Sequence, residues 1–123
     1  MRCCLPALLA LGLIGASGHA AESAGPADAL LGRWDITLHT PDGDQPSWLE
    51  IRRSGHSTLV GQFVGTGGSA RPISRVEFDG DAMHFAIPPQ WEGGNGELDV
   101  RGRLSNGALA GSMSFPDGKQ YEW

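Results

Sequence analysis

Aromatic, acidic and basic side chains alternate along the segment Trp48–Arg52 in a way that suits carbohydrate binding. Trp48, Glu50 and Arg52 lie two residues apart, and in a β-strand this spacing places them on one face of the sheet. The flat face of a tryptophan packs well against a sugar ring, and guanidinium and carboxylate forks hydrogen-bond to its hydroxyl groups. These three side chains are therefore candidates for a ligand-binding surface.

Residues of the same kinds occur further along the chain. Arg71 lies in the middle of the sequence, and Trp91 and Glu92 follow the rigid pair Pro88–Pro89. We predict one ligand-binding patch at an end of the fold, built from Trp48, Glu50, Arg52, Arg71, Trp91 and Glu92. The alternative is that both tryptophans pack in the core with arginines stacked on them.

Metal and acid–base chemistry have weaker support in the sequence. None of His39, His56 and His84 has a second His, Cys or carboxylate at a metal-ligand spacing such as HxH or HExxH. We therefore expect solvent-facing histidines and predict neither a metal nor a cofactor. A pair of carboxylates for glycoside hydrolysis needs only proximity in space. The carboxylates considered for such a pair are Glu50, Glu92 and Glu97.

Short strands must position these residues, because apolar residues alternate over runs that are separated by glycine-, proline- and aspartate-rich turns. The predicted strands are Gly32–Thr40, Ser47–Arg53, Thr58–Gly65, Arg71–Phe78, Ala82–Ile87, Glu97–Leu104, Ala108–Phe115 and Lys119–Trp123. Ile73 is out of phase with Val76 and Phe78, which predicts a β-bulge near Pro72 or Ser74. Asn106–Gly107 is a strong signal for a two-residue type I′ hairpin.

The turns between these strands are short, so consecutive strands are expected to pair in antiparallel order. We predict an all-β fold, an antiparallel up-and-down meander of about eight strands that closes into a small, lipocalin-like β-barrel. A β-sandwich is the alternative, and it requires longer crossover connections than the sequence offers.

The first residues have the pattern of a secretory signal. Arg2 precedes the apolar run Leu5–Ile14, and Gly18–Ala20 provides the small residues of a cleavage site. We expect a signal peptide over residues 1–20, a flexible leader over 21–31 and one barrel domain over 32–123. The protein is then secreted or periplasmic, with no membrane contact after cleavage. Both cysteines, Cys3 and Cys4, leave with the signal.

The charge balance argues against some partners. Loss of Arg2 leaves eight of the nine basic residues against 14 acidic ones, a net charge of −6. The basic residues are scattered, whereas phosphate contacts require clustered lysines and arginines. We therefore expect no nucleic-acid partner.

Two family resemblances add expectations. The segment Leu31–Trp34, with its Gly-x-Trp motif, resembles the start of lipocalin-like and avidin-like barrels. This resemblance implies that Trp34 closes one end of the barrel and that an arginine from late in the chain, Arg101 or Arg103, packs over it.

The second resemblance covers most of the mature chain. The blocks PSWLEIRR (Pro46–Arg53), GSARPIS (Gly68–Ser74), PPQWE (Pro88–Glu92) and PDGKQYEW (Pro116–Trp123) resemble a small β domain. That domain precedes the catalytic domain in some secreted bacterial proteins of the 3-keto-disaccharide hydrolase family. The resemblance implies a non-catalytic accessory or glycan-binding module, with a downstream hydrolase domain or enzyme as partner. A lipocalin-like carrier of a small apolar ligand and a stand-alone weak glycoside hydrolase are the alternatives.

Overall fold

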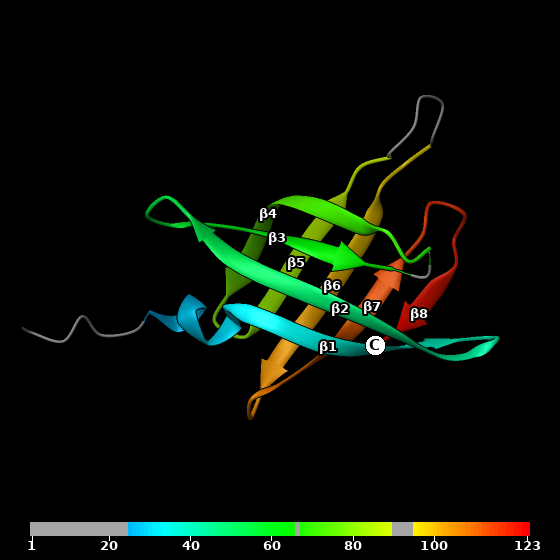
Figure 1. The fold of residues 1–123 in the computed structure, drawn as a ribbon, viewed down its shortest axis with the longest axis horizontal. Coiled ribbons are helices and arrows are strands. Elements are labelled where there is room, and N and C mark those ends of the chain that lie inside the picture. The colour runs from blue at the N-terminus through cyan, green and yellow to red at the C-terminus, as the bar shows by residue number, and fades with distance from the viewer. Residues whose placement is uncertain (1–24, 66, 90–94) are drawn as a thin grey trace, which may run out of the picture.

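The computed structural model describes residues 25–65, 67–89 and 95–123, which form an all-β domain (Figure 1). A short 3-10 helix, η1 (Pro26–Leu30), precedes the strands. The strands are β1 (Gly32–Thr40), β2 (Gly43–Ser54), β3 (Thr58–Val64), β4 (Ala70–Asp79), β5 (Ala82–Ile87), β6 (Leu98–Ser105), β7 (Ala108–Ser114) and β8 (Gln120–Glu122). The predicted bounds of β1 and β5 are confirmed at both ends. β2 begins four residues earlier than predicted, because Thr40 pairs directly with Gly43 across a two-residue turn.

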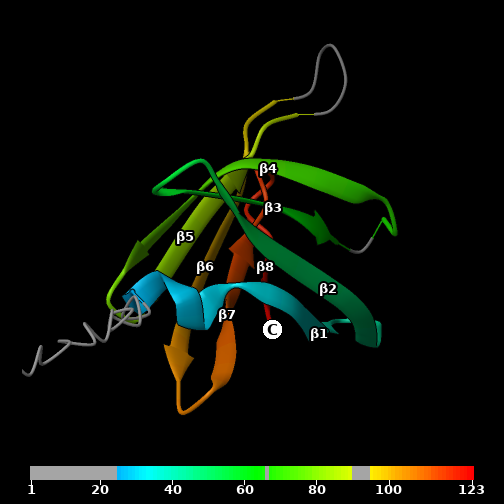
Figure 2. The same ribbon diagram turned by 60° about the vertical axis from the view of Figure 1, so that its left-hand side comes forward.

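The strands form a closed barrel in the order β1 to β8, and every neighbouring pair is antiparallel (Figures 1 and 2). The predicted up-and-down meander and its closure are therefore confirmed. The Asn106–Gly107 turn has positive φ angles of 51° and 75°, as a type I′ hairpin requires. Between β3 and β4 the register shifts, since Leu59 faces Val76 and Gly61 faces Ile73. The extra residue lies near Ser74, where the bulge was predicted.

The alternation along each strand separates a packed interior from a polar exterior. Phe63 and Phe85 meet edge to face inside the barrel, with ring centroids 5.8 Å apart. The buried apolar residues are Leu30, Ile36, Leu38, Leu49, Ile51, Leu59, Phe63, Ile73, Val76, Met83, Phe85, Ile87, Leu98, Val100, Met113 and Trp123. Interiors of eight-stranded barrels are just wide enough for side chains to fill, and here aromatic and aliphatic side chains occupy this space.

The end of the expected flexible leader differs from the prediction. Residues 26–30 form η1, and Leu30 is completely buried against the core. The indole Nε1 of Trp34 donates a hydrogen bond to the Leu30 carbonyl at 3.0 Å, and the Arg53 guanidinium binds the Asp28 carboxylate. The apolar side chain of Leu30 stabilises this segment on the barrel end. Residues 1–20, where we predict the signal peptide, lie outside the described part of the chain.

The arginine expected over Trp34 is absent from that position. Arg101 and Arg103 lie on the exterior, hydrogen-bonded to Asp99 and Asp81 respectively. Their strand positions face outward, because each alternates with a buried or inward-facing neighbour on β6. Trp34 contacts η1 instead, so the expectation from the Gly-x-Trp resemblance is wrong on this point.

Gly102 allows the sheet to approach the ring of Trp123 closely, and Gly111 allows β7 to lie close to the backbone of β6. Trp123 exchanges backbone hydrogen bonds of 2.9 Å in both directions with Gly111. A Cβ atom on Gly102 would lie 2.8 Å from the Trp123 ring, and one on Gly111 would lie 1.9 Å from the Arg101 carbonyl oxygen. An aromatic ring that lies over strand glycines shields the backbone there. Among the described residues, the Trp123 Nε1 is the buried side-chain nitrogen that has no hydrogen-bond partner.

No helix in the described ranges is long and apolar enough to cross a membrane.

We predict that Gly111→Ala destabilises the barrel by about 2–3 kcal/mol, because the new methyl group forces β6 and β7 apart. Gly67→Ala is the matched control, since a Cβ atom there meets no atom within 4 Å. We expect it to change the free energy of unfolding by less than about 0.5 kcal/mol. Urea denaturation followed by tryptophan fluorescence measures both values. Equal stability of the two variants would contradict the close approach at Gly111.

Candidate functional site

Two neighbouring rows of outward side chains cross the sheet from β4 toward β8. In the first row, direct cross-strand partners run Glu77, His84, Arg101, Ser112 and Glu122. In the second row they run Asp79, Ala82, Arg103 and Ala110. Residues directly opposite in an antiparallel pair share a face of the sheet, so both rows lie on the barrel exterior.

These two rows line a groove of about 480 Å³, which we call the polar groove. Met83 on β5, Gly102 on β6 and Gly111 on β7 lie between the two rows and form the base of the groove. Small-molecule sites generally have volumes of about 300–1,000 Å³, so the polar groove has the size of a site for one small ligand or a few linked rings.

Charges in the polar groove follow a simple order across the strands. Carboxylates lie at both ends, Glu77 and Asp79 on β4 and Glu122 on β8, and two guanidinium groups lie in the centre on β6. Of the strands between them, β5 carries Ala82 and His84, and β7 carries the small residues Ala110 and Ser112. Because neighbouring strands are about 4.8 Å apart, the valley over the small residues of β7 is bordered by opposite charges about 10 Å apart, on β6 and β8.

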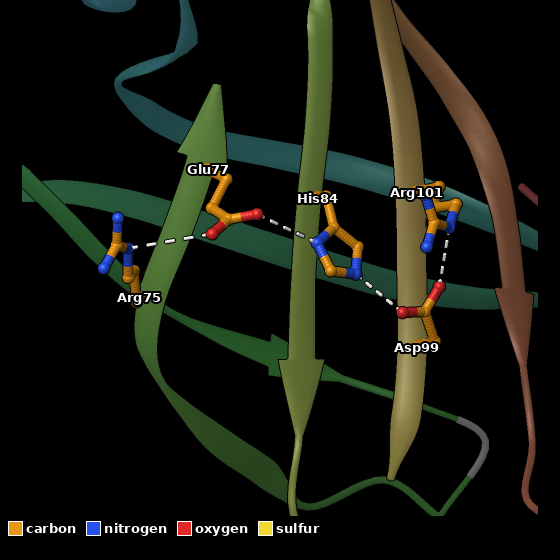
Figure 3. A network of polar contacts seen from close by, with 5 residues as sticks. All are labelled: Arg75, Glu77, His84, Asp99 and Arg101. Carbon is orange, nitrogen blue, oxygen red and sulfur yellow. Dashed lines mark hydrogen bonds and ion pairs between the residues drawn. The ribbon is translucent and has the colours of Figure 1, made fainter. Parts of the chain in front are cut away.

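A hydrogen-bonded network holds one side of this groove in place (Figure 3). His84 lies between two carboxylates: its Nε2 is 2.6 Å from Asp99 Oδ2, and its Nδ1 is 3.3 Å from Glu77 Oε2. Arg101 Nε donates to Asp99 Oδ1 at 2.8 Å. Arg75 approaches Glu77 at 3.9 Å from the other side. The network therefore links the exterior of β4, β5 and β6.

The network changes the proton affinity of its members. The hydrogen bond to Asp99 is the main cause that raises the pKa of His84 above its ordinary value of 6.5, and Glu77 adds to this effect while partial burial opposes it. Partial burial alone would raise the pKa of Asp99, but the hydrogen bonds from His84 and Arg101 outweigh it and lower this pKa below 3.8. Both shifts favour the charged His84–Asp99 pair.

The predicted patch is divided between different surfaces. Trp48, Glu50 and Arg52 share the exterior of β2, as predicted, and Arg52 Nε lies 3.7 Å from Glu50 Oε1. Arg71 pairs with the buried Phe63 and therefore lies on the inner face, at the end of the barrel. The remaining two members, Trp91 and Glu92, lie outside the described residues.

Trp48 is also less available for a ligand than predicted. The Arg33 guanidinium lies over its ring, 4.3 Å from the ring centroid, and the side chain is only partly exposed. A cation on one aromatic face occupies the surface on which a sugar would stack. The alternative drawn from the sequence placed both tryptophans in the core with arginines stacked on them. An arginine does stack on Trp48, but Trp48 lies on the exterior of the barrel and not in the core.

The polar groove was missed because its residues come from five strands. The spacing of the sequence gives His84 no partner, because Glu77 and Asp99 are 7 and 15 residues away. The sequence did contain part of the information needed to find the groove, because two-residue hairpins fix Glu77 opposite His84 and Arg101 opposite Ser112. In the described ranges, no group of three or more His, Cys, Asp or Glu side chains is arranged to hold a metal ion.

Comparisons with protein-family models, with curated proteins and with solved structures find no match to this chain.

We predict that the protonated His84 contributes stability that is present below pH 6.5 and is lost as the pH rises through the raised pKa of this histidine. Wild-type protein should therefore lose unfolding free energy as the pH rises above 6.5, and His84→Gln should remove this part of the loss. His56→Gln is the control, because His56 lies in the exposed β2–β3 turn. Denaturant unfolding over a pH series checks this. Parallel curves for wild type and His84→Gln would refute the prediction.

Proposed function

We propose that this domain is a non-catalytic binding module of a secreted or periplasmic protein, and that it binds carbohydrate in the polar groove. The observation that carries the proposal is the order of groups across the groove: two carboxylates, Ala82 with His84, two arginines, two small residues and a carboxylate. A sugar hydroxyl both donates and accepts hydrogen bonds. A ligand with hydroxyl groups around its rim can therefore pair with the central donors and the terminal acceptors together.

The two central arginines have donor capacity to spare. Arg101 and Arg103 each make one hydrogen bond within the described residues, and both side chains are about two-thirds exposed, at 68% and 67%. A guanidinium group carries five N–H donors in a fixed plane. The two groups stand two residues apart on the same strand, so their remaining donors can contact successive hydroxyls of one ligand.

The balance of charge favours an uncharged ligand. Three carboxylates line the groove against two guanidinium groups and His84, so neither sign dominates. A strongly anionic or cationic ligand would meet repulsion at the ends or at the centre of the groove respectively. A neutral oligosaccharide avoids both, which also agrees with the glycan-processing context that the block resemblance implies.

Two other functions have less support from the geometry. An apolar carrier needs a hollow interior, whereas Phe63, Phe85 and Trp123 lie within the described barrel interior. A glycoside hydrolase needs two carboxylates within about 10 Å. Of the carboxylates considered for such a pair, Glu50 lies on β2 and Glu97 directly precedes β6, which are opposite walls of an eight-stranded barrel. Glu77 and Asp99 lie closer together, but both are hydrogen-bonded to His84, and the pKa of Asp99 is lowered, whereas a general acid needs a raised pKa.

We expect Arg103→Gln to weaken binding of the tightest oligosaccharide in a plant and bacterial panel by about tenfold or more, because it removes charge-assisted hydrogen bonds. Arg52→Gln is the matched control: it has a similar exposed fraction, 60%, but lies on the exterior of β2. Isothermal titration calorimetry of the folded variants measures both affinities.

Other outcomes separate the two surfaces. If Arg52→Gln and Trp48→Ala weaken binding while Arg103→Gln does not, the carbohydrate site is the β2 surface and not the polar groove. If no oligosaccharide in the panel binds the wild-type protein, the proposed function is rejected.

A further inference from the structure

His84 belongs to the walls of two neighbouring hollows on the barrel exterior. One is the polar groove, which His84 and Glu77 both line. The other is a smaller hollow of about 290 Å³ between β4 and the end of β5, and the same two side chains line it. Figure 3 shows the imidazole ring between the carboxylates of Glu77 and Asp99, one from each neighbouring strand. The position of the Glu77 side chain therefore bears directly on the polar groove.

Only the charged form of His84 can satisfy both carboxylates. An imidazolium has an N–H on each ring nitrogen, whereas the neutral ring has only one. Here both nitrogens are engaged, since Nε2 lies 2.6 Å from Asp99 Oδ2 and Nδ1 lies 3.3 Å from Glu77 Oε2. Loss of one proton therefore leaves one carboxylate facing a nitrogen lone pair, which repels it.

The carboxylate that loses its hydrogen bond is Glu77. The contact of His84 with Asp99 is the shorter one, and Asp99 is the less exposed carboxylate, at 34% against 60% for Glu77. Water replaces a lost hydrogen bond less easily at the less exposed site, so Nε2 keeps the remaining proton. In the described part of the chain, Glu77 then retains only the contact with Arg75 at 3.9 Å.

The other charged groups around His84 come from both neighbouring strands. The hydrogen bond to Asp99, together with the one to Glu77, raises the pKa of His84 above 6.5, while partial burial and the charge of Arg101 oppose this shift. Arg101 is directly opposite His84 on β6. The remaining charged side chains near the ring are Arg75 and Asp79 on β4, Arg103 on β6 and Glu97 in the smaller hollow.

The loss of the His84 proton changes what the polar groove offers to a ligand. While His84 is charged, Glu77 Oε2 accepts its hydrogen bond; once the ring is neutral, this oxygen is free to accept one from a sugar hydroxyl. The groove charges change from three carboxylates against three cations to three against two. A neutral ligand responds little to that change in net charge, so the released acceptor has the larger effect.

We propose that His84 regulates carbohydrate binding in the polar groove: the protonated ring holds Glu77, and the neutral ring releases it to the ligand. This regulation rests on the proposed function, because it concerns the same groove. Carbohydrate affinity is then lowest below pH 6.5, increases as His84 loses its proton and is constant at higher pH. By linkage, a bound carbohydrate must favour loss of the His84 proton to the same extent.

Isothermal titration calorimetry of the full chain tests the pH dependence, with cellotetraose, xylotetraose and maltotetraose as neutral probes. From about pH 5.5 to about pH 9, we expect the affinity for the tightest probe to rise by about tenfold, the effect of one charge-assisted hydrogen bond. His84→Gln should reduce this rise to less than about twofold. His39→Gln is the matched control, because His39 pairs with Asp44 and lies opposite Glu122 at the other acidic end of the groove. We expect it to keep the full rise.

NMR without carbohydrate tests the release of Glu77 itself. Nuclear Overhauser contacts between the Glu77 side chain and the His84 ring should weaken as the ring loses its proton, while the contacts of the ring with Asp99 remain. Glu77→Gln should lower the pKa of His84, because it removes one of the two acceptors. Addition of the tightest tetrasaccharide should lower the midpoint of the His84 titration by about one pH unit, the counterpart of a tenfold coupling.

The outcomes separate the regulation from the proposed function. If a tetrasaccharide binds and Arg103→Gln weakens it, but the affinity is constant with pH or rises equally in His84→Gln, the regulation by His84 is rejected and carbohydrate binding stands. An affinity that falls as the pH rises, or a Glu77 side chain that stays on the neutral ring, would also overturn the regulation. If no tetrasaccharide binds at any pH, both the regulation and the proposed function are rejected.

Discussion

Trp123 and Gly111 form the contact on which closure of this barrel depends. Their reciprocal backbone hydrogen bonds hold β8 against β7, and the indole ring then reaches across to Gly102 of β6. The ring fits there because Gly102 has no side chain, and β7 lies close to β6 because Gly111 has none. The ring fills interior space near Met83 and covers the backbone of β6 at Gly102.

The same contact shapes the exterior of the molecule. Gly102 and Gly111 belong to the base of the polar groove, while Arg101, Arg103 and Ser112 alternate with them and form its walls. Because side chains alternate between the two faces of a strand, β6 and β7 pack against Trp123 on the inside of the barrel and carry polar and charged side chains on the outside. A change that displaces Trp123 is expected to move Glu122, the acidic end of the groove, as well as the core.

Much of the fold could be predicted from the sequence because the turns are local. Asn106–Gly107 and Gly80–Asp81 each specify a two-residue hairpin, and from these turns follow the registers of β6 with β7 and of β4 with β5. The phase change at Ile73 indicated the bulge. The inward position of Arg71 also follows from this pattern. Arg71 lies two residues before the inward-facing Ile73, and the bulge comes only after Ile73.

The candidate site was much less accessible to prediction. His84 meets Asp99 and Arg101 only through the register of β5 with β6, and the connection over residues 88–97 is too long for its turn residues to fix that register. The partner of Trp48 was equally hidden, because Arg33 reaches the ring from a neighbouring strand. Side-chain contacts across strands depend on registers that composition and periodicity alone do not determine.

Strand order in this barrel also bears on how it folds. Every ladder except one joins strands that follow each other in the chain, and such contacts form with a small loss of loop entropy. The exception brings His39 to Glu122, which are separated by most of the domain. Since distant contacts form slowly, we expect a transient open sheet to precede the closed barrel, with the edges of β1 and β7 exposed until β8 docks.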